Sequence, residues 1–398
     1  MTPIGYIDAF TRFHVDGWAA DQDNWGGTVK ITIFVNGEEV HTMEADHLRA
    51  QLDQVGPGAT GRYAFSHYFE SPLSPYRRNE IAIKVASTDC FLKGATLTTI
   101  EPIEAEDAGD QFRPQAPILL STMGRSGSTL LMAVLAQHPQ IVVAGQRPFE
   151  VEMGCYYAHA LRALTAAGDH RRSLRADKIT ASEGRFHLGF NPYFEPSFGA
   201  YFRDPKTLPE FINKRVSGRL VTAFRGIILD YYQTVASDQD KSYPLYFAEK
   251  SLPEDDARLG VRLMFRNCKE IALVRDLRDA LCSFMAFGNL SFQESLDDLR
   301  SSSARFLEIA ANPDPGIHFI RYEDLVLQQR ETHAALARFL GVSDFPYDEQ
   351  RMGKLFGDHA TTRSPADSIG RWRKDLTSEQ LDQCGFFQPF LERFGYAV

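Results

Sequence analysis

The chain has 398 residues, too many for one ordinary hydrophobic core, so we expect two domains. Its hydrophobic and charged fractions, 43% and 24%, are those of a soluble globular protein. The net charge of −9 argues against broad binding of nucleic acid or of an anionic membrane surface, so any anion site must be built locally.

Targeting and metal signals are missing from the sequence. The N-terminus carries no basic segment followed by an apolar run, and no stretch approaches the ~20 apolar residues that span a bilayer. We therefore expect a cytoplasmic protein without an integral membrane segment, which leaves room for a peripheral association with the membrane. The five cysteines form no CxxC pair and the eleven histidines show no metal-binding spacing, so we expect core-filling cysteines and no metal.

Residues 1–102 consist of short alternating segments separated by turn signals, which predicts a small all-β sandwich domain. Strands are expected on both sides of an Asn36-Gly37 turn in VKITIFVNGEEVHTMEA (29–45), and again in RYAFSHYF (62–69) and NEIAIKVAS (79–87). Through GYID, DGWAAD, the VNG hairpin and the run ADHLRAQLDQVGPGATGRYAF, this part resembles β-sandwich modules appended to bacterial glycosyltransferases and related cell-surface enzymes.

The acidic stretch at 103–115 has Gly and Pro but no apolar periodicity, and it is predicted to be a linker. In residues 116–398, apolar strands alternate with helical stretches, so we expect an α/β domain with a P-loop-like parallel sheet and flanking helices. The expected strands are APILLST (116–122), PLYFAEK (244–250), EIALVRD (270–276) and IHFIRYED (317–324). The last three run into charged residues, which should converge on one cleft at the carboxyl ends of the strands.

The stretch STMGRSGSTLL (121–131) places a Gly- and Ser-rich turn between the first of these strands and a helix. Such a turn surrounds one anion with backbone N–H groups and the positive end of a helix. Gly124 and Gly127 permit the tight backbone. The loop contains Arg125 and lacks the lysine of a GxxxxGK[ST] loop. Hydroxyl donors are expected at Ser126, Ser128 and Thr129. A plain turn capped by one of its serines is the alternative.

A second candidate anion site lies in LVRDLRDALCSFMAF (273–287). A strand ends just before Arg275, and Ser283 follows eight residues later on the predicted helix. That spacing brings a guanidinium and a hydroxyl to one side of a cleft, which suits a second phosphate. The alternative is a solvated helix start with i,i+3 ion pairs, and this is the interpretation we prefer for Arg278 and Asp279.

Together and in this order, the two stretches resemble the sulfotransferase family. The loop at 123–131 is similar to the family's 5′-phosphosulfate loop, in the arginine form of tyrosylprotein and many bacterial sulfotransferases. Arg275 and Ser283 match the family's Arg and Ser that bind the 3′-phosphate of 3′-phosphoadenosine 5′-phosphosulfate (PAPS). The resemblance covers about residues 116–396, because two later stretches also look familial: IRYEDL (320–325) and GRWRK (370–374).

The resemblance implies the sulfotransferase fold and in-line transfer of a sulfonate from PAPS, without a metal. Arg125 is the candidate for stabilising charge on the leaving bridging oxygen, with a surface arginine as the alternative. Glu150 is the preferred base, with a solvated or salt-bridged carboxylate as the alternative, and Glu152 and Glu249 are the other candidates. Lys250 is expected beside the sulfonate unless it is an ordinary exposed lysine.

Two further residues are implied in donor binding. Tyr322 is expected near the adenine, with a core-filling role as the alternative. Arg371 and Arg373 could both clamp the 3′-phosphate, and Arg371 is the stronger candidate; the alternative is a basic helix start with Trp372 packed inward. The expected donor-binding set is Gly124, Arg125, Ser126, Gly127, Ser128, Thr129, Arg275, Ser283, Tyr322 and Arg371.

The acceptor is expected to be a hydroxyl on a saccharide or glycolipid, because of the appended β-sandwich module, with a peptide tyrosine or a small metabolite as the alternatives. The segment at about 165–220, which matches no family pattern, should shape the acceptor site. Its aromatic-rich run at 186–202 suits stacking on sugar rings and equally a loop packed on the core. Two other functions stay open: a P-loop kinase of a small acceptor, and a non-catalytic module that binds anions or glycans.

Overall fold

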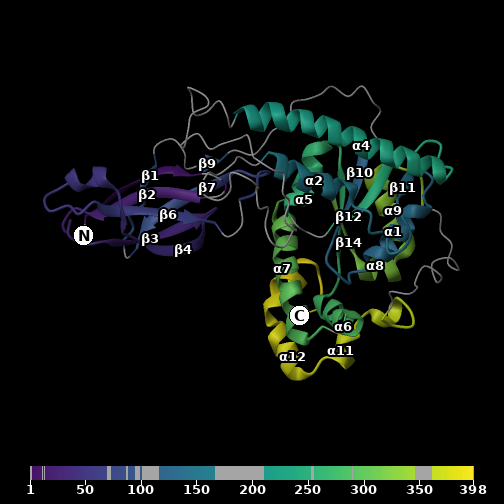
Figure 1. Ribbon diagram of the computed structural model, residues 1–398. Coiled ribbons are helices and arrows are strands. Elements are labelled where there is room, and N and C mark those ends of the chain that lie inside the picture. Colours follow the sequence, from purple (N-terminus) through teal and green to yellow (C-terminus); the bar gives the residue numbers. More distant parts are fainter. Residues whose placement is uncertain are drawn as a thin grey trace. The chain divides into compact units, whose positions relative to one another are not determined.

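The computed structural model describes residues 2–10, 12, 14–69, 73–86, 88–94, 99–100, 116–165, 210–251, 255–288, 290–312, 314–345 and 361–397 (Figure 1). The expected linker at 103–115 and the aromatic-rich run at 186–202 lie outside the described residues, as does most of the 165–220 segment. The chain divides into two units, one of residues 1–106 with 160–220 and the other of residues 107–159 with 221–398.

The first unit contains two sheets of short strands. One sheet has the order β5-β6-β2-β1-β8, and its strands are β1 (Pro3–Phe10), β2 (His14–Asp21), β5 (His47–Leu48), β6 (Arg62–Tyr68) and β8 (Lys93–Gly94). The other has the order β4-β3-β7-β9, and its strands are β3 (Val29–Val35), β4 (Glu38–Ala45), β7 (Asn79–Val85) and β9 (Thr99–Ile100). A 3₁₀ helix, η1, spans Ala50–Gln54.

Alternating burial along the strands explains why the two sheets pack face to face. In β3 every second residue, from Val29 to Val35, is buried, and this row packs with Val15 and Phe65 of the other sheet in one apolar core. The Asn36-Gly37 turn has positive φ at both residues, 51° and 87°, as a two-residue hairpin requires. The predicted small β-sandwich is therefore confirmed.

A five-stranded parallel sheet forms the centre of the second unit, in the order β11-β12-β10-β13-β14. Its strands are β10 (Ala116–Thr122), β11 (Ile141–Val143), β12 (Tyr246–Ser251), β13 (Lys269–Val274) and β14 (Ile317–Arg321). The α-helices are α1 (Ser128–Gln137), α2 (Met153–Leu164), α4 (Ser217–Asp238), α5 (Asp255–Met264), α6 (Leu277–Gly288), α7 (Phe292–Ala311), α8 (Tyr322–Leu327), α9 (Gln329–Leu340), α11 (Trp372–Asp375), α12 (Ser378–Gln383) and α13 (Gln388–Arg393). Single turns of other helix types are η4 (Phe211–Val216), η5 (Ala366–Ser368) and η6 (Cys384–Phe387).

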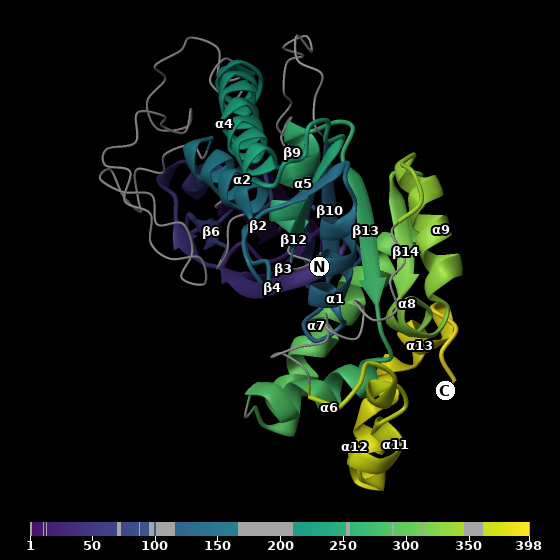
Figure 2. The ribbon, with the colours of Figure 1, turned by 90° about the vertical axis from the view of Figure 1, so that its right-hand side faces the viewer.

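Helices cover both faces of this sheet, so the predicted α/β architecture with flanking helices is confirmed (Figure 2). On one face, apolar residues of α1, α8 and α9 share one core with Ile118 and Leu120 of β10. On the other face, Tyr232 of α4 stacks on Phe247 of β12, with ring centroids 4.1 Å apart. The strands are parallel, so the loops that follow β10, β12, β13 and β14 emerge at the same edge of the sheet.

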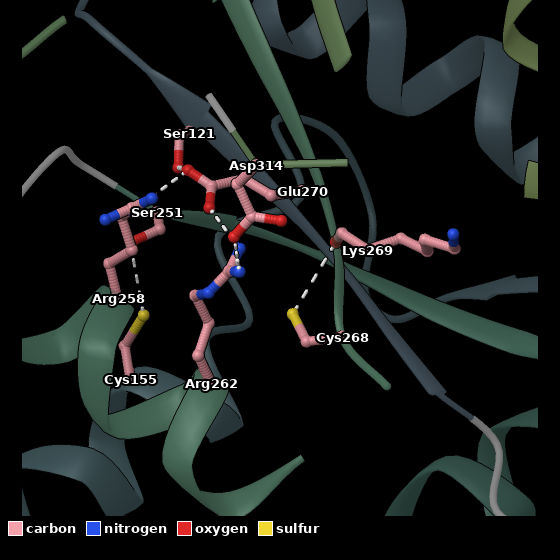
Figure 3. Close-up of polar contacts among 9 residues, drawn as sticks. All are labelled: Ser121, Cys155, Ser251, Arg258, Arg262, Cys268, Lys269, Glu270 and Asp314. Carbon is pink, nitrogen blue, oxygen red and sulfur yellow. Dashed lines mark hydrogen bonds and ion pairs between the residues drawn. The ribbon is translucent and has the colours of Figure 1, made fainter. Parts of the chain in front are cut away.

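A buried ionic cluster joins α5 to the sheet (Figure 3). Glu270 of β13 is fully buried, and its carboxylate accepts hydrogen bonds from Ser121 Oγ at 2.7 Å, Arg258 Nε at 2.6 Å and Arg262 Nη1 at 3.0 Å. Arg262 also pairs with Asp314. Because both carboxylate oxygens are satisfied, this buried charge is tolerated in the core.

Four of the five cysteines are buried, as expected, and Cys90 is half-buried. All five are free thiols, and the buried four are Cys155, Cys268, Cys282 and Cys384.

Candidate functional site

The loop between β10 and α1 depends on two glycines for its shape. Gly127 has φ 95° and serves as the N-cap of α1, and a Cβ placed on it would lie 2.3 Å from Tyr322 Cδ2. A Cβ on Gly124 would lie 2.3 Å from Phe284 Cζ. The rings of Tyr322 and Phe284 therefore touch the loop backbone where only glycine fits.

Ser126 closes this loop from inside. The residue is fully buried, and its hydroxyl donates to the Met123 carbonyl at 2.7 Å and lies within hydrogen-bonding distance of Thr122 Oγ1. This corrects the expectation that the Ser126 hydroxyl faces an anion. It also corrects the alternative of a serine cap, because the N-cap is Gly127 and no side chain caps α1. Ser128 and Thr129 form the first turn of α1.

Arg125 is the residue at which the two predicted motifs meet. It lies in the left-handed region with φ 61°, which is uncommon for a residue with a side chain. Its Nε donates to Ser283 Oγ at 3.1 Å, and its guanidinium lies 4.0 Å from the centroid of the Phe287 ring. Its carbonyl oxygen accepts from Arg275 Nη1 at 2.8 Å. The loop and the start of α6 therefore form one site.

Arg275 follows β13 and is 4% exposed. Its Nη2 donates to the Ser368 carbonyl at 2.7 Å, and its guanidinium lies 4.4 Å from the Tyr322 ring centroid. Its Nε is also buried, yet no acceptor among the residues described by the structure lies within hydrogen-bonding distance of it. A buried guanidinium N–H without an acceptor is costly, so it is a natural place for an anion.

The electrostatics of this region agree with an anion site. Burial lowers the pKa of Arg125, and the positive charges of Arg275 and Arg371 lower it further. Two positive charges thus lie close enough to Arg125 to repel its guanidinium. An anion bound among them would relieve this repulsion.

Lys250 and Glu150 form an ion pair beside the same loop. Lys250 is 5% exposed near the end of β12, and its Nζ donates to Glu150 Oε1 at 2.7 Å and to Thr129 Oγ1 at 3.4 Å. The Glu150 side chain is 60% exposed. Lys250 is therefore not the ordinary exposed lysine of the alternative interpretation, and it connects the loop to the preferred base.

Glu249 faces the opposite side of the sheet, as the alternation of a strand requires. It is 1% exposed, and its carboxylate accepts from Tyr232 Oη at 2.7 Å and from the backbone N–H of Gly154 at 2.8 Å. Burial raises its pKa to about 7, and the charge of Glu152 adds to the rise. Glu249 therefore does not face the loop, which counts against it as the base.

Tyr322 starts α8 directly after β14 and is 3% exposed. Its ring lies against Gly127 and below Arg275, and its hydroxyl is 3.0 Å from Ser368 Oγ and 3.4 Å from the Pro365 carbonyl oxygen. Burial raises its pKa. Its position near an adenine stays a prediction.

Arg371 reaches the site from the C-terminal part of the chain. Its side chain is 14% exposed, with Nη1 donating to Thr361 Oγ1 at 2.9 Å and Nε donating to Asp375 Oδ2 at 2.7 Å. Thr361 Oγ1 lies 3.3 Å from Ser283 Oγ. Arg373 instead lies over the Trp372 ring, 4.4 Å from its centroid. Of the two arginines, the structure connects Arg371 to Ser283.

The start of α6 is buried, which corrects the expectation of a solvated helix start. Arg278 and Asp279 are 7% and 1% exposed. Arg278 pairs with Asp276, two residues earlier, with Nη2 2.8 Å from Oδ2. Asp279 accepts from the backbone N–H groups of Gly370 and Trp372. The C-terminal segment buries these side chains, and no local pattern in RDLRD predicts this burial.

The sequence analysis also missed the contacts that Thr361, Ser368 and Phe284 make at the site. Phe284 carried a usable signal, because it directly follows Ser283 on α6. Among the described residues, no group of three or more His, Cys, Asp or Glu side chains gathers as metal ligands. In the same part of the chain, no helix is long and apolar enough to cross a membrane.

Residues 117–347 match the model of the "Sulfotransferase family". No curated protein matches the sequence. Among solved structures, the sulfotransferase domain of the Synechococcus PCC 7002 olefin synthase is 20% identical, with a TM-score of 0.41, and the match covers 74% of this chain and 99% of that one.

Two further solved structures are similar at the same level. The sulfotransferase domain from the curacin biosynthetic pathway is 19% identical, with a TM-score of 0.40, over 72% of this chain and 99% of that one. A mouse sulfotransferase complexed with PAP is 14% identical, with a TM-score of 0.34, over 73% of this chain and 85% of that one.

Proposed function

Because the chain belongs to the sulfotransferase family, we propose that it transfers a sulfonate from PAPS to a hydroxyl group of a saccharide or glycolipid. The family match supports sulfonate transfer as the reaction. The donor, the acceptor class and the roles of the individual residues are inferred from the site.

The single observation that supports PAPS as donor is the contact of both motifs at Arg125. The 5′-phosphosulfate and the 3′-phosphate of one nucleotide need two neighbouring anion sites. The loop around Gly127 offers the first, and Arg275 with Ser283 offers the second. The buried Nε of Arg275, which has no acceptor among the described residues, fits a group that brings its own anionic oxygen.

When bound, PAPS supplies the sulfonate, and its bond to the 5′-phosphate oxygen breaks as the acceptor oxygen bonds to sulfur. Glu150 takes the proton of the acceptor hydroxyl, because its carboxylate is exposed yet held beside the loop by Lys250. Lys250 and Arg125 stabilise the negative charge that develops on the leaving oxygen. Adenosine 3′,5′-bisphosphate and the sulfated acceptor are the products.

A transferring sulfonate carries less charge than a transferring γ-phosphoryl group, so the cations of the side chains can replace a bridging metal. Arg125, Arg275 and Arg371 act together here, since the positive charges of the other two lower the pKa of Arg125. This division of roles needs no lysine in the loop.

The acceptor class is inferred from the first unit. Its two antiparallel-rich sheets form a sandwich, and its sequence resembles modules appended to enzymes that act on glycans. A module of that kind would keep a saccharide or glycolipid near the enzyme and raise its local concentration.

Turnover with PAPS and a panel of acceptors tests the proposed function. The panel contains oligosaccharides, a glycolipid in detergent, a tyrosine peptide and a simple phenol, and sulfation is detected as the added mass of one sulfonate. Sulfation of the glycans with Glu150→Gln inactive is the expected result. Sulfation of the peptide or the phenol alone would overturn the acceptor class, and release of phosphate from ATP with Mg²⁺ would overturn the donor.

A further inference from the structure

The carboxylate of Asp279 holds the backbone of a distant part of the chain. Asp279 lies in the first turn of α6 and is 1% exposed. Its Oδ2 accepts from the Gly370 N–H at 2.6 Å, and its Oδ1 accepts from the Trp372 N–H at 3.0 Å. Both oxygens of one buried carboxylate are thus used on two peptide groups that lie on either side of Arg371.

This arrangement fixes the residue between the two bonds. Gly370 has φ 72°, a left-handed conformation that glycine adopts at no cost. Arg371 then directs its guanidinium to Thr361 Oγ1, which lies 3.3 Å from Ser283 Oγ. Arg371 therefore lies one hydroxyl group away from a residue of the second anion site.

Within the segment, Arg371 Nε pairs with Asp375 Oδ2 at 2.7 Å, and side chains from outside the segment contact other residues of it. Arg275 bonds to the Ser368 carbonyl, and Tyr322 bonds to the Ser368 hydroxyl, so both act two or more residues before Gly370. Arg278 packs on the Trp372 side chain, with its guanidinium 4.0 Å from the ring centroid. Of these side chains, Asp279 alone bonds to the peptide groups next to Arg371.

We propose that Asp279 is a positioning residue, which clamps Gly370 and Trp372 so that Arg371 stays aimed at the 3′-phosphate of the nucleotide. This inference rests on the proposed function, because it assigns Arg371 to the donor. Asp279 touches no reacting atom and acts through the backbone. Holding the arginine in place before the nucleotide arrives removes the entropy cost of ordering it on binding.

A charged carboxylate is needed for this role. An amide has one acceptor oxygen and would replace the other with an N–H donor, which faces a backbone N–H and repels it. Asp279→Asn keeps the size of the side chain and should therefore release one of the two peptide groups. The released segment would no longer restrict Arg371.

The test is calorimetric binding of two nucleotides that differ in the 3′-phosphate. The probes are adenosine 3′,5′-bisphosphate and adenosine 5′-monophosphate, and the proteins are the full-length wild type, Asp279→Asn, Arg371→Ala and the double variant. The exposed Asp297→Asn of α7 is the matched control. We expect Asp279→Asn to weaken the bisphosphate about tenfold and the monophosphate hardly at all, and the double variant to match Arg371→Ala.

Several outcomes would overturn the inference while leaving the proposed function intact. These are equal losses for both nucleotides, additive losses in the double variant, or unchanged affinity in a folded Asp279→Asn. A wild type that binds neither nucleotide would instead contradict the proposed function itself.

Hydrogen–deuterium exchange of the wild type gives a second readout in case Asp279→Asn does not fold. If the ordered segment favours nucleotide binding, then a nucleotide that contacts Arg371 must in turn stabilise the segment, because the coupling acts in both directions. Amide exchange at 368–376 must therefore slow when that nucleotide binds. The bisphosphate should slow it and the monophosphate should not. Equal slowing by both would contradict the positioning role.

Discussion

Lys250 Nζ lies 2.7 Å from Glu150 Oε1 and 3.4 Å from Thr129 Oγ1, so a buried ammonium bridges the exposed carboxylate and the first turn of α1. Glu150 follows β11, and Thr129 lies in the helix that follows β10. The bridge therefore fixes the distance between the base that we propose and the loop that we propose holds the sulfonate.

Replacing Glu150 by Gln should remove proton abstraction and leave donor binding nearly unchanged. We expect kcat to fall by about 10²–10⁴-fold, the usual range for a general base. Steady-state kinetics with saturating PAPS gives kcat, and calorimetry gives the affinity for adenosine 3′,5′-bisphosphate. Glu152→Gln is the matched control, because the charge of Glu152 acts on Glu249 on the other side of the sheet. A larger loss in Glu152→Gln would exclude Glu150 as the base.

Gly127→Ala should damage the loop through sterics alone. The new Cβ would lie 2.3 Å from Tyr322 Cδ2 at a residue with φ 95°. We expect the free energy of unfolding to fall by ~1–3 kcal/mol, together with a loss of nucleotide affinity. Gly226→Ala in α4 is the control, since nothing lies within 4 Å of its Cβ. That helical substitution should raise the free energy of unfolding by ~0.5–1 kcal/mol. Urea unfolding measures the change in the free energy of unfolding for both variants. An equal change in the two would contradict the steric account.

The buried carboxyl of Glu249 should make stability depend on pH. Burial raises its pKa from 4.5 in a model peptide to about 7, so the folded protein binds this proton more tightly than the unfolded chain does. Its contribution to the free energy of unfolding is therefore fully favourable below pH 4.5 and is lost as the pH rises through about 7.

Glu249→Gln keeps a neutral side chain and removes this dependence. Unfolding of wild type and variant between pH 4.5 and 8 should show the wild type losing stability relative to the variant as the pH rises. A difference that does not change with pH would show that Glu249 titrates normally in the fold.

Glu270→Ala should be one of the most destabilising substitutions in the second unit. It removes a carboxylate that three side chains use and leaves the half-buried guanidinium groups of Arg258 and Arg262 without it (Figure 3). Breaking a buried ion pair on one side costs about 3–5 kcal/mol. Asp297→Ala is the control, because its pair with Arg300 is exposed and should change stability by less than ~1 kcal/mol. Similar losses in both variants would contradict the importance of the cluster.

The sequence revealed the elements of the sheet better than the faces of the helices. Apolar runs predicted β10, β12, β13 and β14, because parallel strands buried on both sides are continuous in hydrophobicity. Lys250 and Arg275 were placed correctly at the loop edge for the same reason.

Burial by residues that are far apart in the sequence explains what the sequence could not reveal. Arg278 and Asp279 resemble a solvated helix start, and only the C-terminal segment, about 90 residues later, buries them. Glu249 and Lys250 are neighbours, and nothing local tells which of the two faces the loop. That choice depends on Tyr232 of α4, which bonds to Glu249 from the opposite face. These assignments require tertiary contacts that local pattern cannot supply.

Calorimetric titration of adenosine 3′,5′-bisphosphate into the wild type and Arg275→Ala tests the assignment of the donor most directly, with ATP and Mg²⁺ as the comparison. The buried guanidinium of Arg275 should contribute one charged phosphate contact. We therefore expect the bisphosphate to bind the wild type and to bind the variant with an affinity that is lower by a factor of about ten or more. Absence of binding to the wild type, or a preference for ATP with Mg²⁺, would contradict PAPS as the donor.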